Sequence, residues 1–276
     1  MHITYKFQIM KQIEFTSKNV KPFTSWLKRF SSIDTSLLLE IDEKDSKFLA
    51  KSYDEQRSIV KYSEISFADA GFVVKKKEAK RIKAGIYNIS RLMKIMDMYT
   101  NTEFSCVFNY DEILSGENKD YAATSIKLLN KDLKMTVECT SLNIFKYISD
   151  ELFTGTIAAI DQVITFNLSR ELMNKVYTLC ILDNDDKYMS FFSKNSSVFV
   201  KGKSFEQLLY TDAVEGNLED TKLDISKEQF EKLDDENYVI AIGEDRMVFT
   251  STDSITTSVI SMVERDENYD GKEESE

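Results

Sequence analysis

The feature that most constrains the fold is a junction that occurs four times along the chain. Each junction is a short strand-like run that ends in Ser, followed at once by a basic residue and an amphipathic segment. The four junctions lie at residues 13–18, 86–91, 165–170 and 223–227. Ser is a favoured helix N-cap, because its hydroxyl accepts a hydrogen bond from an unpaired helical N–H. A cation directly after it is opposed by the partial positive charge of the helix N-terminus. Four such junctions predict an internal repeat in which these cations have a function.

Strand-like segments follow each amphipathic segment. Their alternating apolar and polar residues predict antiparallel strands, in two places joined by short polar turns. The strands are expected at residues 37–41, 48–53, 103–110, 122–129, 188–193, 198–200, 238–242, 247–250 and 256–263. A polar insertion is expected at residues 111–120. The chain is therefore predicted to be α+β, with four units that each contain a strand, a helix and mostly antiparallel strands.

The four units are expected to form two similar domains. Residues 10–140 would hold the first two units and residues 163–263 the last two, joined by an apolar, extended connector at residues 141–162. Residues 1–9 are expected to be an N-terminal extension, because Met10 is an alternative start. Residues 264–276 hold seven acidic residues against two basic ones, which predicts an acidic disordered tail.

The cations of the amphipathic segments are predicted to contact duplex DNA. A net charge of −11 opposes a nucleic-acid partner, but the distribution of charge matters more than its sum. In the first segment Lys21 and Lys28 lie opposite an apolar stripe that includes Phe23. Such cations would contact phosphates without reading base sequence. The residues assigned to this contact are Lys18, Lys21, Lys28, Arg29, Arg91, Lys94, Arg170, Lys175 and Lys227. The alternative is ordinary capping beside solvated cations, and it is strongest for the nearly neutral fourth segment.

Enzymatic chemistry has little support in the sequence. There is no Gly-rich phosphate loop, and the single histidine, His2, lies in the expected extension. Residues 183–186 resemble the start of a calcium loop but lack the Gly that such a loop needs, so a polar turn is expected. No metal and no cofactor is expected. The many carboxylates leave a metal-dependent nuclease as a remote alternative.

The three cysteines, Cys106, Cys139 and Cys180, are odd in number and widely spaced. This pattern indicates reduced thiols in a cytoplasmic protein rather than a disulfide framework or a metal site. No apolar run is long enough to span a membrane, and no signal peptide is recognised at the N-terminus. The sequence therefore predicts a cytoplasmic protein that has no membrane partner.

Four strand–helix–strand units, an apolar connector and basic helix faces make this chain resemble the sliding clamps of tailed phages and, more distantly, PCNA. The resemblance spans residues 10–263 and includes local runs at residues 10–30, 87–92 and 236–263. It implies a DNA-clamp fold with helices inside and antiparallel sheets outside. It also implies a ring of three subunits that encircles duplex DNA, has a clamp loader as a partner and tethers the replicative DNA polymerase, in host cytoplasm if the source is a phage.

The resemblance further implies one groove per subunit, beneath the connector, where tails of the polymerase and the loader dock. By position, Leu152, Phe153 and Ile260 are the candidate groove residues, and simple packing of the connector is the alternative. The basic residues 75–83 depart from the clamp pattern and are expected to form a solvated loop rather than a DNA-binding arm. A monomeric DNA-binding accessory protein of the same fold is the alternative function.

Overall fold

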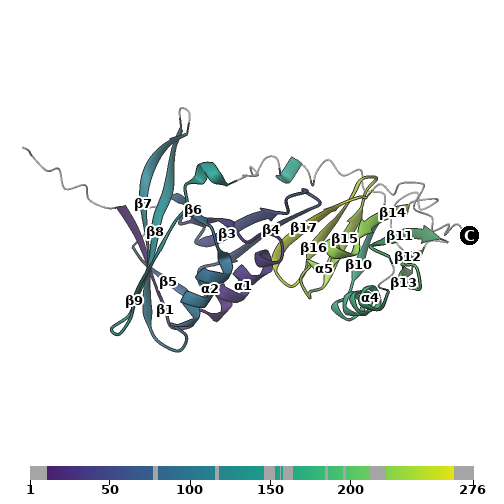
Figure 1. Cartoon of the computed structure of the whole chain (residues 1–276), viewed down its shortest axis with the longest axis horizontal. Coiled ribbons are helices and arrows are strands. Elements are labelled where there is room, and N and C mark those ends of the chain that lie inside the picture. The colour runs from purple at the N-terminus through teal and green to yellow at the C-terminus, as the bar shows by residue number, and fades with distance from the viewer. Residues whose placement is uncertain are drawn as a thin grey trace, which may run out of the picture. The chain divides into compact units, whose positions relative to one another are not determined.

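The computed structural model describes residues 11–76, 80–115, 118–145, 153–155, 157, 164–183, 186–194, 197–211 and 222–263 (Figure 1). The chain divides into two compact units. Unit 1 consists of Met1–Ser52 and Tyr62–Tyr147, and unit 2 consists of Tyr53–Lys61 and Ile148–Glu276. The division after Tyr147 lies inside the predicted connector. The expected N-terminal extension and acidic tail lie outside the described residues.

Residues 53–61 belong to unit 2, whereas the sequence pattern put them in the first domain. Buried polar contacts explain this assignment. The fully buried Lys61 donates through its Nζ to the Lys232 carbonyl oxygen at 2.8 Å and to Asp234 Oδ1 at 3.2 Å. Gln229 Nε2 donates to Asp54 Oδ2 at 3.0 Å. An ammonium group is a favourable partner for the last carbonyls of a helix, so this segment stabilises the helix end that it meets.

Unit 1 contains two consecutive repeats of a strand, a helix and three or four strands. The first repeat comprises β1 (Lys11–Ser17), α1 (Lys21–Ser31), β2 (Leu37–Asp42), β3 (Lys47–Tyr53), β4 (Ile59–Ser66) and β5 (Phe72–Lys76). Tyr53 of β3 and the first three residues of β4 are counted with unit 2. The second repeat comprises β6 (Arg81–Ile86), α2 (Ile89–Asp97), β7 (Phe104–Ser115), β8 (Asn118–Leu129) and β9 (Lys134–Glu138), with the 3₁₀ turn η1 (Leu142–Ile144) after it.

Unit 2 repeats the same order twice. Its first repeat comprises β10 (Ile164–Leu168), α4 (Arg170–Leu182), β11 (Tyr188–Lys194), β12 (Ser197–Lys201) and β13 (Glu206–Thr211). Its second repeat comprises β14 (Lys222–Ser226), α5 (Lys227–Glu231), β15 (Tyr238–Ile242), β16 (Arg246–Ser251) and β17 (Ile255–Ser261). The predicted α+β class with four strand–helix–strand repeats is confirmed.

The two repeats of each unit exchange strands in the same way. In unit 1, β1 pairs antiparallel with β7, the first strand after the other repeat's helix, and β6 pairs antiparallel with β2. In unit 2, β10 pairs with β15, and β14 pairs with β11. The helices α1 and α2 of unit 1 lie side by side (Figure 1). Each unit is therefore built from two interlocked repeats related by an approximate twofold exchange.

The predicted polar insertion at residues 111–120 is wrong. Both strands of the hairpin continue through it, with Asp111 opposite Ala122 and Ser115 opposite Asn118. Polar composition does not prevent strand pairing, because the ladder hydrogen bonds are made by the backbone. Lys11 of β1 reaches Glu112 at 3.2 Å, which fixes one side of this extension.

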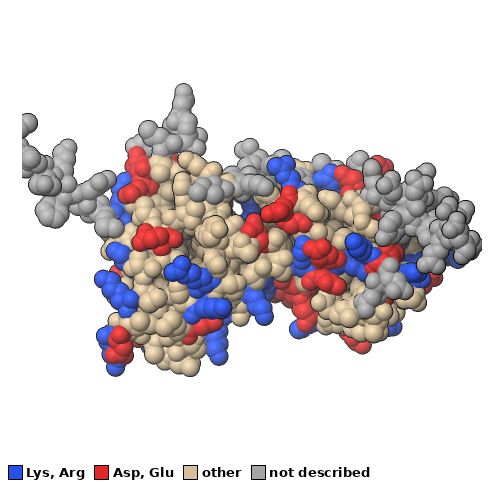
Figure 2. All heavy atoms as spheres, in the orientation of Figure 1, with Lys and Arg blue, Asp and Glu red and all other residues tan. Residues whose placement is uncertain are grey.

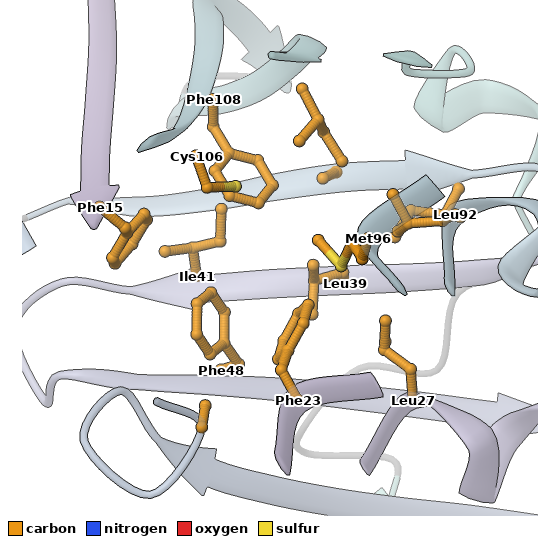
Figure 3. Close-up of a cluster of buried hydrophobic side chains, with 14 of the residues drawn as sticks. Phe15, Phe23, Leu27, Leu39, Ile41, Phe48, Leu92, Met96, Cys106 and Phe108 are labelled. Carbon is orange, nitrogen blue, oxygen red and sulfur yellow. The ribbon is translucent and has the colours of Figure 1, made fainter. Parts of the chain in front are cut away.

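The core of unit 1 lies between the paired helices and the sheet (Figure 3). The stripe predicted for the first helix is confirmed, since Phe23, Leu27 and Phe30 are buried. The helical period of the third amphipathic segment predicts a buried stripe of Leu172, Val176 and Leu179, which is wrong in part. Met173, Val176 and Cys180 are buried in α4, whereas Leu172 and Leu179 lie at the margins. Spacings of three and four residues centre the buried face on Val176.

All three cysteines are free. Burial raises the pKa of Cys139 and Cys180 to about 12 and raises the pKa of the fully buried Cys106 thiol as well. The reactive thiolate forms are therefore scarce at neutral pH. Within the described part of the chain, no helix combines the length and the apolar character that crossing a membrane requires.

Candidate nucleic-acid interface

The four junctions place four helix starts, but their caps differ from the prediction. Ser169 is the N-cap of α4, and its Oγ accepts from Leu172 N at 3.3 Å. Asn88, not Ser90, caps α2, and its Oδ1 accepts from Arg91 N at 2.8 Å. Asn is as good an N-cap as Ser. Asn88 immediately precedes the helix, whereas Ser90 already lies inside it.

The other two junctions carry no side-chain cap. The first helix begins at Lys21 after Val20, and Pro22 occupies its first turn, where the missing N–H has no intrahelical partner to lose. Ser17 instead ends β1, where its Oγ accepts from Asn19 N at 3.2 Å. Ser226 is in the N-cap position of α5 without a side-chain cap hydrogen bond. The junctions thus mark changes from strand to helix more reliably than they mark capping chemistry.

The solvent face of the unit 1 helices is basic. Lys21 and Lys28 on α1 are exposed, as are Arg91 and Lys94 on α2. None of these four cations forms an ion pair with any residue in the described ranges. Neither helix has an acidic residue in its first turn, and α2 contributes the one carboxylate of the two helices, Asp97. Figure 2 shows blue side chains over the place where Figure 1 draws these helices.

Two further predicted residues of unit 1 differ from these four. Lys18 precedes α1 and is exposed, and its Nζ lies 3.6 Å from Glu103 Oε2. An exposed pair of this kind is worth little, so the ammonium group is accessible to another anion. Arg29 is half-buried on the side of α1. Lys18 therefore belongs with the exposed cations, whereas Arg29 presents only part of its side chain.

The corresponding surface of unit 2 is different. Arg170 is exposed, but its Nη2 lies 2.5 Å from Asp235 Oδ2, and this hydrogen bond lowers the pKa of the Asp235 carboxyl. Asn174 Nδ2 donates to the other oxygen of Asp235 at 2.8 Å. Lys175 is exposed and forms no ion pair with any of the described residues. The predicted cations of α4 thus reduce to one unpaired ammonium group and one neutralised guanidinium group.

The assignment of Lys227 to DNA contact is wrong. Its side chain is buried, and its Nζ donates to Asp183 Oδ2 at 2.7 Å and to the Asp183 carbonyl oxygen at 2.6 Å. Asp183 also accepts from Lys203 N at 2.9 Å and from Ser204 N at 3.0 Å. The lysine therefore joins the start of α5 to the end of α4 and to the turn before β13. A buried, paired ammonium group cannot reach a polyanion.

These contacts set the ionisation of Asp183. Burial by itself would raise its pKa, but the hydrogen bonds from Lys227, Ser204 and Lys203 N, with the Lys227 charge, lower it to about 2. The unfolded chain takes up this proton near the ordinary value of about 3.9. A lowered native pKa contributes stability that is present above the unfolded value and is lost as the pH falls toward the native one.

We expect Asp183→Asn to flatten the pH dependence of the unfolding free energy between about pH 4 and about pH 2, because the group that gains a proton on unfolding is gone. Urea unfolding at a series of pH values measures this slope. Asp132→Asn, at an exposed turn, is the matched control and should keep the native slope. If the unfolding free energies of the two variants had equal slopes against pH, this pH dependence would not belong to Asp183.

Solved structures match this arrangement of repeats. PCNA of A. fulgidus, bound to the C-terminal region of FEN-1, has a TM-score of 0.60 over 92% of this chain and 99% of its own, at 13% identity. The Helicobacter pylori beta clamp bound to a DNA ligase peptide has a TM-score of 0.62 over 94% of this chain and 68% of its own, at 10% identity. The chain has the fold of the DNA sliding clamps.

The extent of the match differs between clamp types. PCNA of Entamoeba histolytica is covered over 99% of its length, with a TM-score of 0.61 over 92% of this chain and 13% identity. The DNA polymerase sliding clamp of Pseudomonas aeruginosa is covered over only 65% of its length, with a TM-score of 0.60 over 92% of this chain and 10% identity. No protein-family model and no curated protein sequence matches this clamp-fold chain.

The candidate groove residues of the clamp fold do not form a described surface. Leu152 lies outside the described residues. Phe153 is buried, with 7% of its surface exposed. Ile260 is fully buried in β17, opposite Met247 of β16, so it belongs to the core and its assignment to an open groove is wrong. Successive side chains of a strand point to opposite faces, and Ile260 lies on the inward face of β17. Its position in the chain alone does not show which face it occupies.

The basic residues 75–83 lie on and between β5 and β6, with residues 77–79 outside the description. Their charged groups have local partners. Lys75 Nζ lies 2.9 Å from Glu14 Oε1, and Lys83 Nζ lies 2.8 Å from Asp120 Oδ2. Lys80 Nζ lies over the Tyr121 ring, 4.8 Å from its centroid. Lys75, Lys80 and Lys83 are therefore held by partners within unit 1 of the clamp fold.

The expected calcium-like turn also lies partly outside the described chain, since residues 184–185 are not described. Asp183 is occupied by Lys227 and the backbone of the β12–β13 turn. Among the described residues of this clamp fold, no group of histidine, cysteine and carboxylate side chains could hold a metal ion.

Proposed function

We propose that this chain is a DNA sliding clamp, a non-enzymatic protein of the cytoplasm that encircles duplex DNA and tethers the replicative DNA polymerase. The observation that carries the proposal is the unpaired basic face of α1 and α2 in a chain with the clamp fold. Exposed lysines and arginines contact phosphates and position a protein on DNA without specifying base sequence. A non-specific, backbone-directed surface is what a protein that travels along DNA requires.

The modest number of unpaired cations also supports sliding. Each phosphate contact adds counterion-release affinity and its salt dependence. The net charge of −11 acts in the opposite direction, because the body of the protein repels the polyanion. Retention by encirclement with weak contact then permits movement, whereas many firm contacts would hold the protein at one place.

Ring closure is proposed to join β9 of one copy to β13 of the next. Within the described sheets, β9 pairs only with β8 and β13 only with β12, so each presents an open edge. Open edges expose unpaired backbone groups that another strand can pair with. Two apolar side chains of unit 2 are exposed: Leu208, on β13 itself, is 40% exposed, and Leu182, at the end of α4, is 73% exposed. Head-to-tail pairing of three copies would close the ring and cover these side chains.

Polymerase and clamp-loader peptides are the proposed protein partners. Two clamps that share this fold were solved with peptides of DNA enzymes, one with the C-terminal region of FEN-1 and one with a DNA ligase peptide. A short peptide that anchors a few apolar side chains is the interaction mode that fits such complexes.

The test of the ring is the mass in solution, from size-exclusion chromatography with light scattering. We expect three times the mass of the 31.9-kDa chain. Leu208→Asp should shift the protein to monomers, because a carboxylate at the β13 edge would be desolvated without a partner in the interface. Ile255→Asp is the matched control in unit 2: it lies at the start of β17, is 61% exposed and should leave the mass unchanged.

The other functions predict different results. A monomeric DNA-binding accessory protein would have the mass of one chain at every concentration and would bind linear DNA strongly at low salt. A metal-dependent nuclease would cleave DNA when magnesium or manganese is added. Either result would contradict the sliding-clamp proposal.

A further inference from the structure

We propose that the two units contribute unequally to DNA contact: the α1–α2 face of unit 1 holds the duplex, and the α4–α5 face of unit 2 does not. This inference rests on the proposed function and names the half of the chain that meets the phosphates. It follows from the partners of each helix cation, unit by unit.

The unit 1 face is a surface of unpaired cations. Lys21, Lys28, Arg91 and Lys94 are exposed, with no ion pair to any residue that the structure describes. They come from two helices that lie side by side, so they form one surface. Between the cations of α1 lies the small exposed Ser25, which leaves room for a phosphate backbone to approach.

On the unit 2 face, carboxylates accompany or exceed the cations. Of the three predicted cations, Lys227 is buried against Asp183, and Arg170 is held by Asp235. The exposed carboxylates of the two helices are Glu171, Glu228 and Glu231. The short α5 contributes no exposed cation, because its one lysine points into the unit. Of its two exposed carboxylates, Glu228 pairs with Lys232 Nζ at 3.0 Å, which leaves Glu231 as negative charge. Figure 2 shows red side chains among the blue ones over this unit.

The difference has a direct electrostatic consequence. A phosphate near α1 and α2 meets unpaired positive charge, and a phosphate near α4 and α5 meets a mixed or negative surface. Exposed charges within about 10 Å interact at moderate ionic strength, so the sign of the nearest residues decides the local preference. Releasing Arg170 for DNA would also leave Asp235 facing the phosphates. The duplex is thus expected to lie against unit 1.

A matched pair of double variants tests this inference. Lys28→Ala/Arg91→Ala removes one lysine and one arginine from unit 1, and Arg170→Ala/Lys175→Ala removes the same types from unit 2. Fluorescence anisotropy with a short linear duplex, beginning at low salt, gives the slope of log affinity against log salt. The salt slope of the unit 1 variant should be shallower than the native slope by about 2, since each of the two lost phosphate contacts contributes about 0.9. The salt slope of the unit 2 variant should differ from the native slope by less than the contribution of about one phosphate contact.

Photo-crosslinking supplies a second readout that does not depend on affinity. A crosslinker is attached at Ser25→Cys on α1 or at Thr178→Cys on α4, both of which are exposed positions. Attachment is selective because the three native thiols are buried or half-buried and have raised pKa values. Position 25 should crosslink the duplex several times more than position 178.

The outcomes separate this inference from the proposed function. Equal slope changes for the two double variants, or equal crosslinking from the two positions, in a chain that forms the ring would overturn the unequal contact and leave the clamp function standing. A native chain that is monomeric at every concentration would overturn the clamp function whichever unit crosslinks more. Asp235→Asn should free Arg170 and steepen the slope by about one contact, and an unchanged slope would contradict the pairing argument.

Discussion

Replacing Lys227 by Met is expected to lower the unfolding free energy by about 3–5 kcal/mol, because it leaves the Asp183 carboxylate buried without its cation. Lys227 and Asp183 are 6% and 3% exposed, so water cannot replace the lost partner without opening the structure. The methionine side chain keeps most of the packing volume, which isolates the charge from a cavity effect. Urea unfolding at fixed protein concentration measures the loss.

Lys175→Met is the matched control for this prediction. It removes an exposed lysine from the neighbouring helix and should change stability by no more than about 0.5 kcal/mol. The double variant Lys227→Met/Asp183→Asn should recover part of the loss, since no buried charge is left unpaired. If Lys227→Met were as stable as Lys175→Met, the ion pair would not be the contact that holds α5 to the end of α4.

Replacing Phe15 by Ala is expected to cost about 3–5 kcal/mol, the range for removing a large aromatic side chain from a core. Phe15 on β1 is fully buried (Figure 3). Its ring centroid lies 4.9 Å from that of Phe67 and 5.5 Å from that of Phe48. These residues come from three separate segments of unit 1, so the cavity would loosen contacts among all of them and cannot be filled by one local shift.

The control for Phe15→Ala is Tyr87→Ala, at a residue of unit 1 that is 73% exposed. It removes an aromatic ring without opening a cavity and should change stability by about 0.5 kcal/mol or less. Thermal unfolding followed by circular dichroism, with both variants at the same concentration, compares them. A loss for Phe15→Ala no larger than that for Tyr87→Ala would mean that the aromatic cluster does not stabilise unit 1.

The helix junctions were predictable because local chemistry determines them. A strand-like run, a polar residue and an amphipathic period of 3.6 residues are all read from neighbours in the chain. The buried stripe of α1 follows in the same way, since Phe23, Leu27 and Phe30 recur at helical spacing. The cap itself was less predictable, because Asn88 and Ser90 are both good caps two residues apart and only the backbone selects one.

The candidate interface was predictable only in unit 1. Lys21 and Lys28 face away from an apolar stripe that the sequence displays, so their exposure follows from period alone. Arg170 and Lys227 have the same local setting, but each meets a carboxylate that is distant in sequence: Asp235 for Arg170 and Asp183 for Lys227. One signal was present, because the fourth segment is nearly neutral, which already favoured ordinary capping over DNA contact there.

The sequence by itself determined the α+β fold class, the four repeats and the outward basic face of α1, because each of these depends on residues within a few turns or strands of one another. Tertiary structure alone decided that residues 53–61 join unit 2, that Lys227 points inward and that Arg170 is neutralised. The physical reason is that the free energy of a charged side chain depends on its burial and on the nearest opposite charge. Chain folding brings that charge from far away in the sequence.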